Sequence, residues 1–230
     1  MRVRKEHSVS LTVRLHRFLP MTEAEGPGRR ACLWVQGCER HCPGCFNQAT
    51  WDRNAGSLVT VDQLFEWIME APAIEGVTFV GGEPFLQAGP LAALGQQCQI
   101  QGLSVVTFTG YTLEGLSLAD PPHWQALLAV TDLLLAGPYE ADKQDFSRPW
   151  VGSRNQEFVF LTPKYRHLTS ALADIPNHLE LRVEANGAVS LNGMASETEI
   201  GNVQRRLAEL GLSMQLNGAS NHDKDNSNSH

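Results

Sequence analysis

Gly37-Cys-Glu-Arg-His-Cys-Pro-Gly-Cys-Phe-Asn47 is the stretch that decides the fold and the chemistry expected of this chain. It places Cys38, Cys42 and Cys45 in a C-x3-C-x2-C spacing on one short loop. Thiolates hold iron-sulfur clusters, and a cubane cluster usually takes four of them, so a loop with three leaves one iron without a protein ligand. Such an open iron can bind a small molecule. The spacing therefore predicts a metal centre, and it favours an open cluster.

Structural zinc and a disulfide framework are the two other interpretations of the cysteines. Structural zinc prefers four Cys or His ligands, but the nearest candidate, His41, is adjacent to Cys42, and neighbouring residues rarely reach one tetrahedral ion together. Zinc stays open as an alternative. A disulfide framework is disfavoured because five cysteines is an odd number and residues 1–15 lack the apolar run of a secretory signal. Cys32 and Cys98 lie in apolar or helical surroundings and are expected in the core.

Composition limits the class of protein. A chain of 230 residues with 42% apolar content can bury one sizeable core. The formal net charge of −7 argues against a dedicated nucleic-acid binder, which would carry a basic surface. No window reaches the ~18 uninterrupted apolar residues of a membrane span. Without an export signal we expect a cytoplasmic protein with no membrane partner, in a compartment that favours metal-bound thiolates over disulfides.

Strands and helices are expected to alternate along most of the chain. Hydrophobic patterning predicts strands over 11–19, 31–36, 76–80, 103–108, 132–135 and 157–161, and helices over 63–70, 90–100 and 123–130. A hairpin over 178–191 turning at Asn186-Gly187, a helix over 197–210 and a last strand over 212–216 are expected to follow. The alternation implies βαβ units and a parallel sheet with right-handed crossovers.

Four loops share a position that indicates function. The cysteine loop, Gly81-Gly-Glu-Pro84, Thr109-Gly-Tyr111 and Gly137-Pro-Tyr139 each follow the carboxyl end of an expected strand. In parallel barrels and open α/β sheets, that edge carries the active site. We therefore expect the four loops to converge on one site.

Together these motifs resemble the radical S-adenosylmethionine (SAM) superfamily, and within it the anaerobic ribonucleotide reductase activating proteins. The resemblance covers about residues 22–161. It rests on the cysteine stretch and Gly81-Gly-Glu-Pro84, which are typical of the superfamily. It rests further on Gly26-Pro-Gly28, Arg30, Thr50-Trp51, Thr109-Gly-Tyr111 and Trp150-x-Gly-Ser-x-Asn-Gln156.

The resemblance implies a 4Fe-4S cluster on Cys38, Cys42 and Cys45, with SAM chelating the fourth iron. Glu83 and the backbone of Gly81 and Gly82 would hold the SAM ammonium group, since a carboxylate supplies charge-assisted acceptors and glycines let the backbone approach closely. By itself, Gly-Gly-Glu-Pro is equally typical of an ordinary turn. The other expected cofactor contacts are Gly44, Phe46, Thr109 and Tyr111.

The implied reaction is reductive cleavage of SAM to methionine and a 5′-deoxyadenosyl radical, which abstracts a hydrogen atom. In this family the substrate is a glycine of a partner glycyl radical enzyme, such as anaerobic ribonucleotide reductase, and the electron would come from a flavodoxin- or ferredoxin-type reductant. A radical SAM enzyme that modifies a peptide or small molecule is the alternative enzyme. A non-catalytic zinc or iron-sulfur electron-transfer module is the alternative from another class.

The implied fold is a partial (β/α) TIM-like barrel with a small C-terminal α+β extension. A full barrel needs ~250 residues, and five or six strands are available here. The expected division is a radical SAM core at 1–165, the extension at 166–216 and a low-complexity, disordered tail at 217–230. Two features depart from the family: Ala136 replaces an acidic residue, and 168–216 exceeds the short activating proteins. Both leave the identity of the partner open.

Overall fold

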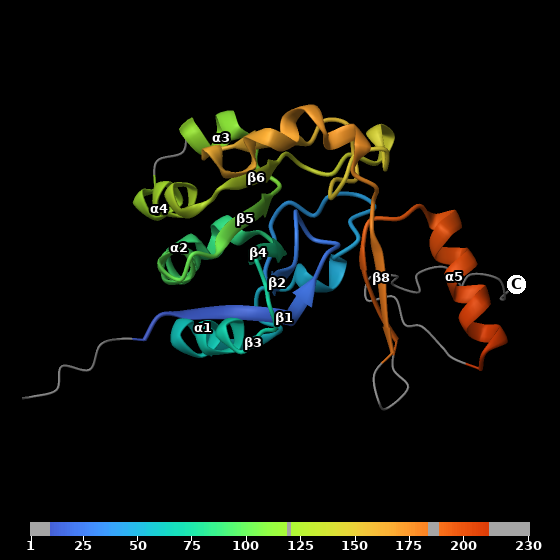
Figure 1. Ribbon diagram of the computed structural model, residues 1–230, viewed down its shortest axis with the longest axis horizontal. Coiled ribbons are helices and arrows are strands. Elements are labelled where there is room, and N and C mark those ends of the chain that lie inside the picture. The colour runs from blue at the N-terminus through green and yellow to red at the C-terminus, as the bar shows by residue number, and fades with distance from the viewer. Residues whose placement is uncertain (1–9, 119–120, 184–188, 212–230) are drawn as a thin grey trace, which may run out of the picture.

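The computed structural model describes residues 10–118, 121–183 and 189–211. The larger of the two sheets in these ranges is mixed (Figure 1). Its seven strands lie in the order β3-β1-β2-β4-β5-β6-β7 in these ranges. The strands are β1 (Thr12–Thr22), β2 (Arg30–Val35), β3 (Ser57–Thr60), β4 (Gly76–Gly81), β5 (Ser104–Thr109), β6 (Leu133–Ala136) and β7 (Glu157–Phe160). The central strands β2, β4, β5 and β6 are parallel. The sheet is open, with β3 and β7 at its two edges.

Crossover helices connect the parallel strands. The α-helices are α1 (Val61–Met69), α2 (Ala88–Ile100), α3 (Leu113–Leu118), α4 (Pro122–Val130) and α5 (Glu197–Glu209). Short 3-10 helices are η1 (Gln48–Thr50), η2 (Pro84–Gln87), η3 (Ala141–Lys143), η4 (Pro163–Ser170) and η5 (Leu172–Asp174). The hydroxyl of Thr60 caps α1 by accepting the Gln63 N–H at 3.1 Å.

Burial along the strands reflects their place in the sheet. All six residues of β2 are buried, as expected for a central strand covered on both faces. The half-buried pattern of β1 suits an antiparallel strand nearer the edge, and β1 pairs antiparallel with both β2 and β3. The parallel pairing of four strands brings their carboxyl ends, and the loops that follow, to one edge of the sheet.

The two faces of the sheet have separate cores. Leu33, Phe79 and Val105 pack with α1, α2 and α4, which lie together on one side of the strands (Figure 1). Because strand side chains alternate between faces, Trp34 and Val80 belong to the opposite face. There the chain after β6 covers the sheet with Trp150 and Tyr165, among other residues.

Arg30 ties this covering segment to the sheet at the end of β2 remote from the cysteine loop. Its guanidinium is fully buried. It donates to the Thr78 hydroxyl at 2.7 Å, to the Ser104 hydroxyl at 3.0 Å and to the Tyr165 hydroxyl at 2.9 Å. Burial lowers the pKa of Arg30, so these oxygen acceptors and three backbone carbonyls take the place of water around the charge.

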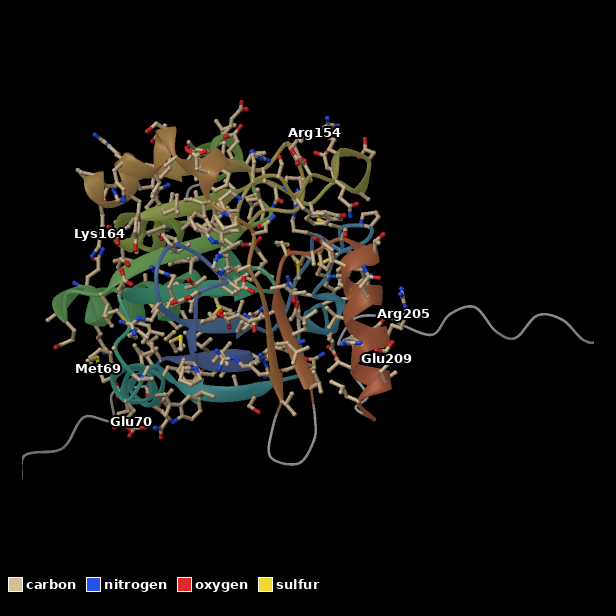
Figure 2. The ribbon with its side chains drawn as sticks, turned by 45° about the vertical axis from the view of Figure 1, so that its right-hand side comes forward. Met69, Glu70, Arg154, Lys164, Arg205 and Glu209 are labelled. Atoms are coloured by element: carbon tan, nitrogen blue, oxygen red, sulfur yellow. The ribbon has the colours of Figure 1, made fainter. Side chains whose placement is uncertain are left out.

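A second sheet of two strands, β8 (Leu179–Val183) and β9 (Val189–Gly193), stands beside β1 together with α5 (Figures 1 and 2). The Asn192 amide donates to the Thr22 hydroxyl at 2.9 Å, and the Glu23 N–H donates to Glu180 at 2.6 Å. Ser196 begins α5 with a capping box. These contacts attach the hairpin to the C-terminal end of β1 and to the residue that follows it.

The structure confirms the βαβ order and corrects the expectation of a parallel sheet. β1 and β7 run antiparallel to their neighbours, and β3 and α3 were not predicted. β3 is a four-residue strand whose pairing with β1 is a long-range contact, so its local pattern carried little signal. The Asn186-Gly187 turn, the strand over 212–216 and the tail at 217–230 lie outside the described residues.

Candidate functional site

The four loops converge on one cavity of about 120 Å³ at the carboxyl edge of the parallel strands. The loop after β2 contributes Cys38, Cys42, Cys45 and Phe46, and the loop after β4 contributes Gly81, Gly82 and Glu83. The loops after β5 and β6 contribute Thr109, Gly110, Gly137 and Tyr139. The convergence predicted from the positions of the loops is therefore confirmed.

Backbone hydrogen bonds close the cysteine loop on itself. The N–H of Gly37 donates to the Thr50 carbonyl at 2.7 Å, and the N–H of Cys38 donates to the Trp51 carbonyl at 3.2 Å. His41 has a φ of 45° and its ring stacks on Trp51 at 4.6 Å between centroids. The Thr-Trp motif thus holds the two ends of the loop together.

The three cysteine thiols face the same cavity and are half-buried. Burial raises the pKa of Cys38 and Cys45, against the opposing effect of backbone N–H groups that point at their sulfurs, one of them Asn47 N–H at 3.4 Å from Cys45 Sγ. Iron would supply the positive charge that ionises such thiols. Soft thiolates that accept N–H bonds are a donor set that fits an iron-sulfur cluster. Among the described residues, no three His, Cys, Asp or Glu side chains are spaced for a single metal ion.

Glu83 joins two loops beneath the cavity. Its carboxylate accepts the Phe85 N–H at 3.0 Å, the Thr109 hydroxyl at 2.9 Å and the Gly110 N–H at 2.8 Å. Only 1% of Glu83 is exposed, and burial raises its pKa to about 7 although these hydrogen bonds lower it. Within the part of the chain that the structure describes, Arg40 is the cation that favours the charged form of this buried carboxylate, and its effect is smaller than that of burial.

The glycines before Glu83 are required by close approach. Gly81 has a φ of 107°, and a Cβ there would lie 2.7 Å from Trp34 Cα. A Cβ on Gly82 would lie 2.2 Å from the Gly37 carbonyl oxygen. The Gly-Gly pair therefore lets the loop after β4 press against the start of the cysteine loop.

Two of the predicted cofactor contacts lie away from this cavity. The ring of Tyr111 packs on Trp124 at 4.9 Å and under the Arg40 guanidinium at 5.1 Å, and Tyr111 is not among the lining residues. Gly44 lines a neighbouring cavity, and a Cβ there would lie 3.3 Å from the Tyr139 ring. Phe46 and Thr109 do line the site.

Other predicted residues are placed as follows. Cys32 and Cys98 are fully buried, and burial raises the pKa of Cys98 to about 12, which confirms them as core residues. Ala136 is 1% exposed and packs in the core on the helix-covered face, so an acid at this position would be buried there. Met194 lines the cavity although no motif marked it, because it comes from the C-terminal extension.

A second cavity of about 480 Å³ adjoins the first. Cys45, Phe46, Asn47, Val80 and Met194 border both cavities. Its remaining walls come from β1 and β2, from the residues after β1, from the cysteine loop and η1, and from β8, β9 and α5. The extension is therefore part of the lining around the cysteine loop.

Comparison with known proteins places these features in a family. The family model described as "4Fe-4S single cluster domain" matches residues 24–159. An anaerobic ribonucleoside-triphosphate reductase-activating protein of Salmonella typhimurium is 30% identical over 152 residues, which are 63% of this chain and 96% of that protein. The same-named protein of Pasteurella multocida is 35% identical over 156 residues, 60% of this chain and 92% of its own length. These matches confirm the resemblance expected from the motifs.

A partial relative and a solved structure complete the comparison. A putative glycyl-radical enzyme activating enzyme of Haemophilus influenzae is 40% identical over 95 residues, 40% of this chain and 36% of that protein. The crystal structure of QueE from Escherichia coli aligns with a TM-score of 0.39 and 14% identity, covering 89% of this chain and 94% of that one. No helix in the described residues is long and apolar enough to cross a membrane.

Proposed function

We propose, from the premise that this chain belongs to the 4Fe-4S single cluster domain family, that it is a radical SAM activating enzyme of the kind named in its relatives. The observation that carries the proposal is the convergence of three cysteine thiols and one buried carboxylate on a single cavity. Loops far apart in the sequence build this cavity. A loop that only scaffolded a metal would not need Glu83 and its hydrogen-bond partners beside it.

Cys38, Cys42 and Cys45 would hold a 4Fe-4S cluster and leave one iron open for SAM. When bound and reduced, the cluster supplies the electron that cleaves SAM to methionine and a 5′-deoxyadenosyl radical, which becomes 5′-deoxyadenosine when it takes a hydrogen atom from the substrate. The protein contributes the position of the reactants and the exclusion of water. Because the thiols are half-buried beneath the converging loops, bulk water has limited access to them.

Glu83 is proposed to hold the SAM ammonium group, with the backbone of Gly81 and Gly82 beside it. Its carboxylate is positioned by three donors, so it needs little reorganisation to receive a cation. Phe46 and Thr109 are proposed as direct contacts of SAM. Gly44 and Tyr111 would then affect SAM binding indirectly. Gly44 would do so by packing against the Tyr139 ring, and Tyr111 by positioning the Arg40 guanidinium.

The proposed substrate is a glycine of a partner glycyl radical enzyme. The relatives that align with this chain over most of their own length are named as reductase-activating proteins. Glycine suits hydrogen abstraction because no Cβ hinders approach to its Cα. We propose a flavodoxin- or ferredoxin-type reductant and a cytoplasmic location, where reducing conditions keep thiols available; all five cysteines are free in the structure. Modification of a peptide or small molecule is the second candidate function. It is favoured by the second cavity, which the extension helps to line.

The finer architecture belongs to the same proposal. The open sheet with four parallel central strands suits a partial (β/α) barrel, and its inner face would be the one lined by Trp34 and Val80. We propose a core at 1–165 and an extension at 166–216. The extension's hairpin packs on β1 through side chains rather than joining the main sheet, which supports the division.

Electron paramagnetic resonance tests the proposed function. The anaerobically reconstituted protein, reduced with dithionite, is expected to show a reduced 4Fe-4S signal that changes when SAM is added, and to release methionine and 5′-deoxyadenosine. A cluster signal insensitive to SAM, without either product, would reduce the protein to an electron-transfer module. One equivalent of zinc and no iron after anaerobic preparation would favour the zinc alternative.

A further inference from the structure

The second cavity is distinctive because the extension contributes eight of its nineteen lining residues. Its volume of about 480 Å³ lies in the range of ligand-binding pockets, ~300–1,000 Å³. Leu179, Ile200 and Gln204 of the extension line it, opposite Trp34 and Val80 of the main sheet. The family match ends at residue 159, so the extension wall is a feature of this chain beyond the matched core. The cavity opens beside Cys45 and Phe46, where the reactive group would be held.

Strand β9 meets this cavity along its edge. Every residue from Ser190 to Gly193 lines the cavity, and Met194 continues the wall. Because successive strand side chains point to opposite faces, a cavity that touches each residue in turn lies beside the strand rather than over one face. In the described residues β9 pairs with β8 alone, so its other edge is unpaired. Glu25, which accepts the Gly193 N–H on that side, lines the cavity, as does Leu179 of β8.

The hydrogen bond of Gly193 shows which way the backbone groups of this edge point. Its N–H donates to the Glu25 carboxylate at 3.0 Å, away from β8. In an antiparallel pair the outward-pointing residues recur at every second position, so Leu191 directs its N–H and C=O toward the same side. The register pairs Leu191 with Leu181, whose N–H and C=O therefore point to the opposite, outer edge of the hairpin. Glu25 is 7% exposed and stands where the carbonyl of a neighbouring strand would be.

We propose that β9 is a docking edge for an extended segment of the polypeptide substrate, which pairs with the backbone of Leu191 and runs past Cys45 toward the cluster site. This binding mode is strand addition, in which main-chain hydrogen bonds supply affinity and side-chain pockets supply specificity. The inference rests on the proposed function, because it identifies the segment as the one that presents the glycine. The segment would lie beside β9 at the ordinary spacing of ~4.8 Å between strands.

The surroundings of the edge suit a polypeptide rather than a single small anion or cation. Trp34 and Phe46 offer apolar surface, and Glu25 offers an acceptor. The Asn192 side chain is 6% exposed, and its Oδ1 has no hydrogen-bond partner within the described part of the chain. A small rotation would present this acceptor to an N–H of the bound segment. Apolar surface and hydrogen-bonding groups therefore both line the cavity beside this edge.

The test uses the reconstituted protein and a display library of seven-residue peptides with glycine at the centre. Enriched peptides are expected to bind the wild-type protein and to lose affinity at least tenfold, about 1.4 kcal/mol, for Leu191→Pro. Proline removes the N–H that points into the cavity, and edge strands tolerate it. Leu181→Pro is the matched control, since it removes the corresponding N–H on the outer edge; its affinity is expected to stay within twofold of wild type.

A second measurement separates backbone pairing from contact with side chains. N-methylation of the enriched peptide at successive amides should weaken binding at every second position only. The inference is overturned if no peptide is enriched, if both proline variants bind equally, or if methylation has no alternating effect. Production of 5′-deoxyadenosine without peptide is measured in parallel for all three proteins. Its absence from the wild type would refute the proposed function, whereas normal production without peptide binding would refute the docking edge alone.

Discussion

Replacing Glu83 by Gln tests the electrostatics at the centre of the site. The carboxyl group is 1% exposed, and burial raises its pKa from the ordinary value of 4.5 to about 7. A carboxyl with a higher pKa in the folded protein than in the unfolded chain binds its proton more tightly when folded. Its protonation therefore stabilises the fold fully below pH 4.5, and this stability is lost as the pH rises through about 7. The difference corresponds to about 3 kcal/mol, in order of magnitude.

The Gln variant removes this dependence and weakens one contact. Its amide oxygen can still accept from Phe85 N–H and the Thr109 hydroxyl, but its NH2 group would face the Gly110 N–H, which now bonds to the carboxylate at 2.8 Å. A buried donor left unpaired costs ~1–3 kcal/mol. At pH 5 we expect the free energy of unfolding of Glu83→Gln to be lower than that of the wild type by this amount. At pH 8 the wild type has lost its proton, so the difference should vanish or reverse.

Urea unfolding at pH 5 and pH 8, with iron content matched between the proteins, measures these differences. Glu25 requires a control, because burial also raises its pKa to about 7. The wild-type profile contains both groups, and only the difference between wild type and variant isolates Glu83. Glu25→Gln should remove a separate contribution of the same sign. If wild type and Glu83→Gln differ by the same free energy at both pH values, Glu83 does not titrate in this range and the burial argument is wrong.

The same variant connects stability to SAM binding. An ionised Glu83 attracts the SAM ammonium, so the affinity of the wild type for SAM should increase as the pH rises toward 8. In Glu83→Gln that increase should be absent and the affinity lower throughout, as measured by isothermal titration calorimetry on the reconstituted protein. Equal affinity in both proteins would remove Glu83 from the SAM site.

Four other substitutions test further parts of the structure. Cys42→Ala should abolish cluster assembly, measured as iron and sulfide content, whereas Cys98→Ala, in the core, should retain it; iron loss in the latter would refute the ligand assignment. The buried indole N–H of Trp51 has no hydrogen-bond partner of normal geometry in the described residues. It lies toward the Cys45 thiol and lowers the pKa of that thiol. Trp51→Phe should keep the cluster but shift its midpoint potential to more negative values in a redox titration, because an N–H near sulfur stabilises the reduced state; an unchanged potential would place the indole elsewhere. Arg30→Lys should lower the free energy of unfolding by ~2–4 kcal/mol, because six hydrogen bonds from Arg30 are replaced by at most three. A loss below ~1 kcal/mol in urea unfolding would contradict the idea that Arg30 holds the covering segment on the sheet.

Much of the site could be predicted because its signals are local. The spacing of Cys38, Cys42 and Cys45 is a property of one loop, and the Gly81-Gly82 pair lacks the Cβ atoms that would prevent a close approach of the backbone. The fully buried β2 is recognisable from its own apolar run, and Thr60 caps α1 from three residues away. Elements whose conformation depends on local sequence signals were therefore predicted correctly.

Strand direction and the network around Glu83 were decided by tertiary structure. Whether β1 or β7 runs parallel or antiparallel depends on a partner strand, and a strand's own sequence does not name that partner. The donors to Glu83 include Thr109 and Gly110 from the next loop. Burial raises the pKa of Glu83, and both the donors and the burial come from packing and not from the Gly-Gly-Glu-Pro motif.

The same distinction explains Tyr111 and the second cavity. Tyr111 follows the motif that predicted it as a cofactor contact, yet α4 offers Trp124 as a packing surface and the ring turns there. The extension carries no recognisable motif, but folding brings Met194 beside Cys45 and sets the edge of β9 along the cavity. The sequence by itself determined which residues could do chemistry, because ligand type and spacing are covalent properties. The tertiary structure alone decided what surrounds them, because burial, hydrogen-bond partners and cavity walls arise only when distant segments pack together.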